Sequence, residues 1–259
     1  MPIPTLNDNF HMKIKLIMVV LLLAVSSSAG AQSSDGASLW SSVTVEKKLS
    51  KKLSVDVEAE MRTMPQLDGV SRWSGGVGAD YKLLKWLTAS AAYDLLYDHN
   101  IKYTHHDDGS LNKRADYWAP RHRFTTGLTA EADVQRFTLS VAEKWQYTYT
   151  PEKTIASRYD YDKERQDGKQ KVYKGKGKSY LRSKFKAEYN IKGLPLTPYA
   201  SVELYNGWSV KKTRYTLGCG WSITKHHKLG LYYRYQDKAD ADDNDTERHI
   251  IGVDYKFKF

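Results

Sequence analysis

The chain has 259 residues, a formal net charge of +10 and a single cysteine, Cys219, which excludes an internal disulfide. Its mean hydropathy of -0.63 excludes a bundle of apolar membrane helices, but not a transmembrane β-barrel, because only every second strand residue of a barrel meets lipid. The 19 Tyr and 7 Trp outnumber the 6 Phe, and Tyr and Trp concentrate where a membrane meets water.

The beginning of the chain has the features of a targeting segment. A short basic stretch, Met12 to Lys15, precedes an almost purely apolar run from Leu16 to Val25, and small residues follow up to Ala31. This run is too short to span a bilayer as a helix, and its flanks are typical of a cleaved signal peptide. We expect residues 1–31 to be an upstream extension and signal peptide, and residues 32–259 to form one barrel domain.

After the signal segment, apolar and polar residues alternate in a way that predicts strands. The last strand alternates strictly and ends the chain on Phe259, similar to the carboxy-terminal signal that the barrel-assembly machinery reads in outer-membrane proteins. Strands of about ten residues are long enough to cross a bilayer when tilted. In chain order the predicted strands cover residues 39–49, 53–62, 70–82, 86–98, 121–133, 136–149, 181–189, 196–206, 214–223, 228–235 and 251–259.

The predicted connections alternate in length. Short turns near 50–51, 83–85, 134–135, 192–193 and 225–227 alternate with longer polar connections near 63–70, 99–120, 150–178, 207–211 and 237–246. Short turns at one end and long loops at the other are typical of outer-membrane barrels, whereas a soluble β-sandwich gives no reason for the alternation. We therefore predict an all-β, closed antiparallel transmembrane β-barrel of about 10–12 strands in the bacterial outer membrane.

Two details of this prediction stay open. Bacterial single-chain barrels have an even strand number, so that either one of the eleven segments is miscounted or residues 39–49 do not span fully. In the segment 136–149, Glu143 falls on the lipid-facing side. Either a bulge near Ala142 shifts the register, or Glu143 lies near an interface.

Several stretches resemble one known family. The resemblance covers most of the chain after the signal segment and implies an outer-membrane barrel, but it transfers no activity and no catalytic residue. The family is called domain of unknown function 2490, and the stretches similar to it are Trp40–Val43, Glu46–Leu49, Glu60–Arg62, Arg72–Ser74, Gly78–Leu83, Lys85–Leu87, Tyr93–Tyr97 and Tyr255–Phe257.

Motifs that carry chemistry are weak in this sequence. Gly177-Lys178-Ser179 matches the end of a phosphate-binding loop, but Val172 stands where that motif needs glycine, so we interpret it as a solvated basic turn. The His105–Asp108 run lacks further ligands at metal-site spacing, and the calcium-like Asp240–Asn244 segment has Asp245 at the glycine position. A loose calcium or lipopolysaccharide-bridging site there stays an alternative.

Catalysis and nucleic-acid binding have little support. The histidines do not lie beside a Ser–Asn pattern of barrel hydrolases, and His122 and His249 are interpreted as interface residues. The basic residues alternate with apolar ones along strands, which does not favour nucleic acid. We expect no enzyme activity, no cofactor and no metal.

Alternation also predicts which charges point into the lumen. Two interpretations compete: a salt-bridged plug, or a narrow porin-like channel with a transverse field in which reversing Arg182, Lys184 and Lys186 changes ion selectivity. The predicted lumen-lining residues are acidic in early strands and basic in late ones: Glu46, Asp56, Glu58, Glu60, Asp80 and Asp94, then Arg182, Lys184, Lys186, Arg214, Arg234 and Lys256.

The function with most support is a narrow charge-selective channel for ions or small polar solutes. The alternative is a non-conducting surface barrel that binds a partner or lipopolysaccharide through outer loops, such as the charged connection 150–178, although such loops are usually only solvated. A lipid-modifying barrel enzyme has the least support. The expected partners are outer-membrane lipid, lipopolysaccharide and, during biogenesis, the barrel-assembly machinery.

Overall fold

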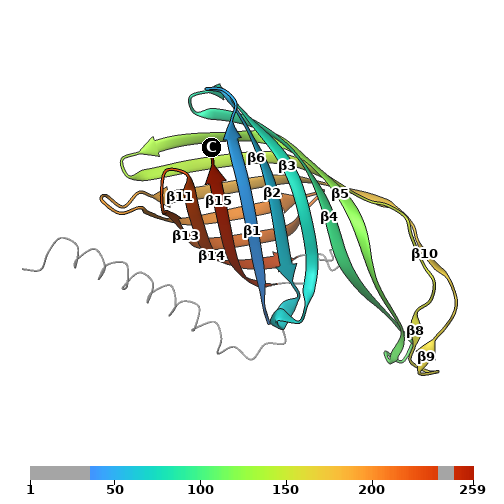
Figure 1. The fold of residues 1–259 in the computed structure, drawn as a ribbon. Helices are drawn as coiled ribbons and strands as arrows, with labels where there is room; N and C mark the ends of the chain where they lie inside the picture. The colour runs from blue at the N-terminus through green and yellow to red at the C-terminus, as the bar shows by residue number, and fades with distance from the viewer. Residues whose placement is uncertain (1–35, 239–247) are drawn as a thin grey trace, which may run out of the picture. The chain divides into compact units, whose positions relative to one another are not determined.

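The computed structural model describes residues 36–238 and 248–259, and these ranges are mostly β-strand (Figure 1). The predicted signal peptide and the Asp240–Asn244 motif lie outside the described residues. None of the helical segments in these ranges has the length and apolar character needed to cross a membrane. Eleven long strands form the barrel: β1 (Ala37–Lys48), β2 (Leu53–Thr63), β3 (Val70–Leu84), β4 (Leu87–His105), β5 (Leu111–Val134), β6 (Phe137–Thr150), β11 (Lys176–Tyr189), β12 (Leu196–Asn206), β13 (Val210–Ser222), β14 (His227–Lys238) and β15 (His249–Lys258).

The strands close into a ring in which each strand pairs with its neighbours in sequence. All of these pairs are antiparallel except the closing one, in which β1 runs parallel to β15 with Ala37 opposite His249 and Glu46 opposite Lys258. The Phe259 N–H extends this pairing by donating to the Glu46 carbonyl at 2.9 Å. An odd number of up-and-down strands brings the first and last strands together in the same direction. The prediction of 10–12 strands is confirmed, and residues 39–48 belong to the full strand β1.

The two ends of the barrel differ in the length of their connections. We call one the turn end, where residues 49–52, 85–86, 135–136, 190–195 and 223–226 link strands, and the other the loop end, where residues 64–69, 106–110, 151–175 and 207–209 do so. A short 3-10 helix, η1 (Pro65–Leu67), lies in the first of the loop-end connections. The predicted long connection 99–120 is wrong, because β4 continues to His105 and β5 begins at Leu111. Strand pairing outside a bilayer does not require apolar alternation, so the sequence pattern ends before the strands do.

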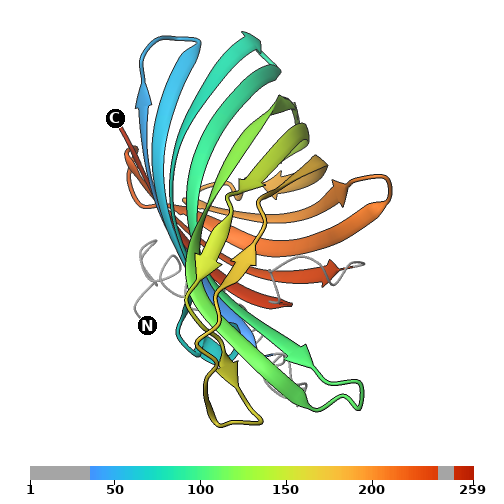
Figure 2. The ribbon, with the colours of Figure 1, turned by 90° about the vertical axis from the view of Figure 1, so that its right-hand side faces the viewer.

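The connection 151–175 is folded onto this extended hairpin. It contains β7 (Lys153–Ile155), β8 (Tyr159–Asp160), β9 (Arg165–Gln166) and β10 (Lys171–Tyr173). Strand β8 pairs with β5, β7 pairs with β10, and the rings of Tyr117 and Tyr173 stack with centroids 5.1 Å apart. In Figure 2 the β4–β5 hairpin and this connection extend past the other strands.

Asp167 fixes the conformation of this connection. Its buried carboxylate accepts backbone N–H bonds from Arg158 at 2.9 Å and Lys169 at 3.0 Å, and the Lys113 ammonium lies 3.0 Å away. The two backbone bonds and this ammonium hold the pKa of Asp167 well below its ordinary value. The connection is therefore an ordered part of the loop end rather than a merely solvated loop.

The barrel wall is apolar outside and polar inside. On β13, Arg214 is 7% exposed and Thr216 is 5% exposed, whereas Leu217, on the other face of the same strand, is 64% exposed. This inverts the usual burial pattern of a soluble protein and suits a barrel that faces lipid. Glu143 is an exception on the outer face. Strand β6 keeps continuous register with both neighbours, so the suggested bulge near Ala142 is wrong, and the Glu143 carboxylate instead accepts a bond from the Ser183 hydroxyl at 3.0 Å.

Candidate functional site

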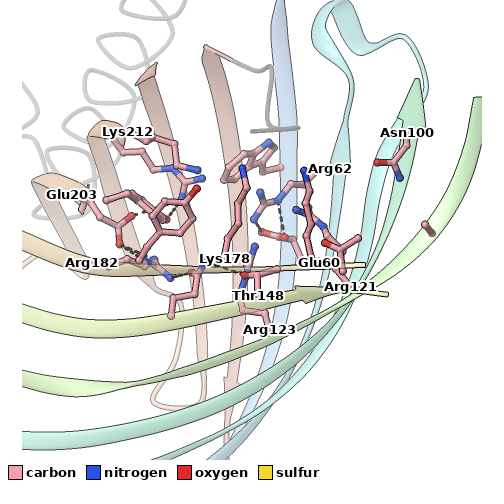
Figure 3. A pocket seen from close by; sticks show the side chains of 18 of the residues that line it. Glu60, Arg62, Asn100, Arg121, Arg123, Thr148, Lys178, Arg182, Glu203 and Lys212 are labelled. Atoms are coloured by element: carbon pink, nitrogen blue, oxygen red, sulfur yellow. Dashed lines mark hydrogen bonds and ion pairs between the residues drawn. The ribbon is translucent and has the colours of Figure 1, made fainter. Parts of the chain in front are cut away.

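The lumen contains a cavity of about 310 Å³ that reaches the loop end (Figure 3). Within the part of the chain that the structure describes, thirteen Arg and Lys residues and four Asp and Glu residues line it. The acidic four are Glu58, Glu60, Glu203 and Asp254. Such a lining creates a strongly positive potential, which a low-dielectric wall focuses into the cavity.

The first charged group lies around Glu60 and Asp98. Arg62 donates to both oxygens of Glu60, at 2.7 and 2.9 Å, which is a bidentate pair. The buried Asp98 carboxylate binds two arginines on neighbouring strands, Arg72 at 2.5 Å and Arg121 at 2.6 Å. Figure 3 shows Arg62, Arg121 and Arg123 around Glu60. The two Asp98 pairs tie β3, β4 and β5 together on the inside of the wall, whereas the Arg62–Glu60 pair lies within β2.

The second charged group lies around Glu203 on β12. Its carboxylate is 2.7 Å from Arg182 and 3.7 Å from Arg214. Arg182 also donates to the Gln146 side chain at 2.8 Å, and Arg214 donates to the Gln236 side chain at 2.7 Å. Two cations therefore share one buried carboxylate, and a neutral amide accepts one further hydrogen bond from each of them.

Aromatic rings lie beside cations of both charged groups. The Tyr205 ring is 4.9 Å from the Arg182 guanidinium and 4.8 Å from that of Arg214. The Trp40 ring lies 3.5 Å from the Arg62 guanidinium and 5.2 Å from those of Arg214 and Arg234. Because an aromatic face attracts cations, these rings lower the cost of placing like charges in one lumen.

Some lumen charges form no ion pair within the part of the chain that the structure describes. Among the described residues no ion pair joins the acids of β2, β3 and β4 with the bases of β11 to β14, so the direct salt bridges that a plug requires are not present there. Glu58 accepts a bond from the Thr44 hydroxyl at 3.0 Å, and Asp254 accepts one from the Ser42 hydroxyl at 2.8 Å. Within residues 36–238 and 248–259, the lumen charges that form no ion pair with one another are acidic at Asp56, Glu58, Asp80, Asp94 and Asp254, and basic at Arg123, Lys144, Lys184 and Arg234.

The structure places the twelve predicted lumen residues in three settings. Glu58, Glu60, Arg182, Lys184, Arg214 and Arg234 line the cavity. Towards the turn end, Lys256 pairs with Glu46 at 2.7 Å and Lys186 pairs with Glu188 at 2.8 Å. The remaining three, Asp56, Asp80 and Asp94, lie on β2, β3 and β4 outside the cavity lining and form no ion pair with a described residue.

Several cavity cations were not among the predicted residues. Arg121 and Arg123 alternate with His122 and Phe124, so the same alternation rule would have placed them inside. The structure adds further cations at the loop end: Lys102, Lys153, Lys174, Lys176, Lys178 and Lys212. The interpretation of Gly177–Ser179 as a turn is wrong, because these residues begin strand β11 and Lys178 lines the cavity.

The other motifs are accounted for by local contacts. His106 lies 3.1 Å from Asp162, and Asp108 accepts bonds from the Ser110 N–H and hydroxyl. Within the two described ranges, no group of three His, Cys, Asp or Glu side chains is arranged to hold a metal ion. His122 and His249 each share a hydrogen bond with a tyrosine hydroxyl, at 2.8 and 2.7 Å.

Comparisons with known proteins agree with this barrel. The structure is similar to the beta domain of the Bordetella autotransporter BrkA, with a TM-score of 0.50 and 14% identity over 80% of this chain and 82% of that one. It also matches the translocator domain of the autotransporter NalP from Neisseria meningitidis, with a TM-score of 0.45 and 12% identity over 88% of this chain and 92% of that one.

These similarities concern the fold alone, and the match to BrkA supports the closed barrel. None of the curated proteins matches the chain. The model of the family described as protein of unknown function DUF2490 matches residues 37–247, which span β1 to β14 and the connection to β15. The chain therefore belongs to the DUF2490 family.

Proposed function

We propose that this protein is a narrow, anion-preferring channel of the bacterial outer membrane. The observation that carries the proposal is the cavity lining, in which Arg and Lys outnumber Asp and Glu by thirteen to four among the described residues. A channel lined by surplus positive charge concentrates anions and repels cations. Eleven strands lie between the eight that side chains fill and the sixteen that leave a wide aqueous pore.

The membrane location has separate support. Large apolar side chains form the outer face, including Val57 at 58%, Val77 at 54% and Leu217 at 64% exposure. A belt of this kind is costly in water and favourable in lipid. The predicted signal peptide supplies a route out of the cytoplasm, and the terminal Phe259 supplies a sequence that the barrel-assembly machinery would read.

The test is the reversal potential of the refolded barrel in a planar bilayer under a KCl gradient. We expect chloride to be preferred and Lys184→Glu to reduce that preference, because Lys184 lines the cavity and has no ion-pair partner among the described residues. Lys186→Glu is the matched control, since Lys186 lies on the same strand face but pairs with Glu188 outside the cavity. Arg182 is a poorer probe because reversing it also breaks the Glu203 pair.

Two results would contradict the proposal. A preference for potassium, or a Lys184→Glu barrel with unchanged selectivity, would show that the cavity charges do not govern permeation. Silence from a barrel shown to be folded would exclude a channel.

A second candidate function is binding of lipopolysaccharide phosphates at the loop end. It is favoured by Lys153, Lys174 and Lys176, which the connection 151–175 and the start of β11 place at the cavity lining. Replacing all three by Gln should weaken binding of the folded barrel to lipopolysaccharide micelles. Unchanged binding would exclude this site.

A further inference from the structure

Four charges that form no ion pair with any described residue face the same part of the lumen. Glu58 on β2 and Asp254 on β15 lie on either side of β1, whereas Lys184 on β11 is separated from β15 by three strands of the ring. Arg234 projects from β14, and all four side chains line the cavity. The lumen thus holds opposite charges on different parts of its wall.

These charges interact across the lumen without touching. Asp254 is within electrostatic range of both Arg234 and Lys184, yet none of the ion pairs of the described residues joins Asp254 to either cation. Polar partners on the wall hold each group in place instead. Ser42 donates to Asp254 at 2.8 Å, and Arg234 donates to the Thr216 hydroxyl at 3.0 Å. Because these opposite charges line the cavity without contacting each other, the space between them can hold water or a solute.

On the side of β14 and β15, a glycine of the wall leaves room for an aromatic ring that would otherwise project into this space. The Tyr232 ring lies flat over Gly252, where an added Cβ would meet ring atoms at 1.9 to 2.3 Å. A side chain at position 252 would push this ring into the lumen. The glycine therefore lets a large luminal tyrosine lie against the wall between Arg234 and Asp254.

From this arrangement we infer that the lumen selects small zwitterions, with an ammonium group directed to Glu58 and Asp254 and a carboxylate, sulfonate or phosphate directed to Lys184 and Arg234. A simple anion gains at the cations but is repelled by the acids, and a simple cation meets the reverse. A zwitterion gains at both and turns its dipole along the transverse field. The inference rests on the proposed channel and names its solute class.

The test compares four solutes of similar size in liposome swelling with the reconstituted barrel: 4-aminobutyrate, butyrate, butylammonium and the neutral butyramide. We expect 4-aminobutyrate to permeate about three- to tenfold faster than butyramide, the range that one or two charge contacts across water give. Asp254→Asn should favour butyrate, and Lys184→Gln should favour butylammonium. The double variant should lose the zwitterion preference, whereas Lys186→Gln should keep it.

The outcomes separate the two proposals. If the barrel conducts chloride but passes 4-aminobutyrate no faster than butyramide, the zwitterion inference fails and the channel stands. If a folded barrel passes nothing, the channel fails, and equilibrium dialysis with 4-aminobutyrate then decides the inference. Binding that both Asp254→Asn and Lys184→Gln weaken would support a zwitterion site, and absence of binding would overturn it.

Discussion

Glu203 should be the charge whose loss destabilises the barrel most. Its side chain is 10% exposed, and its carboxylate is shared by Arg182 at 2.7 Å and Arg214 at 3.7 Å. Glu203→Gln removes the negative charge that Arg182 and Arg214 share, with Lys184 nearby. Removing one partner of a buried pair typically costs about 3–5 kcal/mol. Since these groups line a cavity that water can enter, we expect the loss of unfolding free energy to be smaller, about 2–3 kcal/mol.

This loss can be measured by urea unfolding of the barrel in lipid vesicles, followed by tryptophan fluorescence. With a slope of about 1–3 kcal/mol per molar urea, the midpoint should fall by roughly 1 M. Adding Arg182→Gln should recover part of the loss, because residues in contact are not additive. Glu188→Gln is the control: it removes the partner of Lys186, and both side chains are 27% exposed, so the cost should stay below about 1 kcal/mol. A Glu203→Gln barrel within roughly 0.5 kcal/mol of the wild type would refute the reasoning.

Three further predictions concern assembly, packing and pH. Deleting Phe259 should lower the yield of folded, heat-modifiable barrel in cells, and a normal yield would contradict its role as an assembly signal. Gly252→Ala should lower the unfolding free energy by about 1–3 kcal/mol by overpacking against Tyr232, whereas Gly230→Ala, whose nearest neighbour is 3.6 Å away, should be tolerated. Because the pKa of Asp167 is lowered, its stabilisation of residues 151–175 is present above the ordinary value of about 3.9 and is lost only as the pH falls through the lowered pKa. Hydrogen exchange of this connection, corrected for intrinsic rates, should therefore stay constant from neutral pH to mildly acidic pH and rise in Asp167→Asn; a rise in the wild type over the same interval would argue against the carboxylate.

The strands were predictable because the lipid imposes a pattern on one face. Every predicted segment corresponds to an observed strand, and most boundaries agree within a few residues. The prediction failed for residues 99–105 and 111–120, where β4 and β5 continue past the apolar belt. There the pairing is stabilised by contacts such as the His99–Asp116 pair at 2.6 Å, which leave no periodic signal in the sequence.

The ion pairs that the lumen charges form were less predictable than the side of the strand to which each charge points. Alternation indicates that Arg182 and Lys184 point to the same side of β11, but it gives no reason why Arg182 pairs with Glu203 while Lys184 forms no ion pair with a described residue. The register of β11 against β12 does not explain this difference either, because Lys184 lies directly opposite Glu203 and Arg182 lies opposite Tyr205. Contacts with the folded connection 151–175 also arise from tertiary structure that no local pattern encodes.

The parallel seam between β1 and β15 has a consequence for any experiment on orientation. In a barrel with an even strand count, both chain ends emerge on one side, and labels on them report the same compartment. Here β1 starts at the loop end and β15 finishes at the turn end, so that a label before Ala37 and a cysteine-linked label at Lys258, which leaves Phe259 in place, report opposite compartments. One protein carrying both labels would thus read out its own direction of insertion, each tag serving as the internal standard for the other.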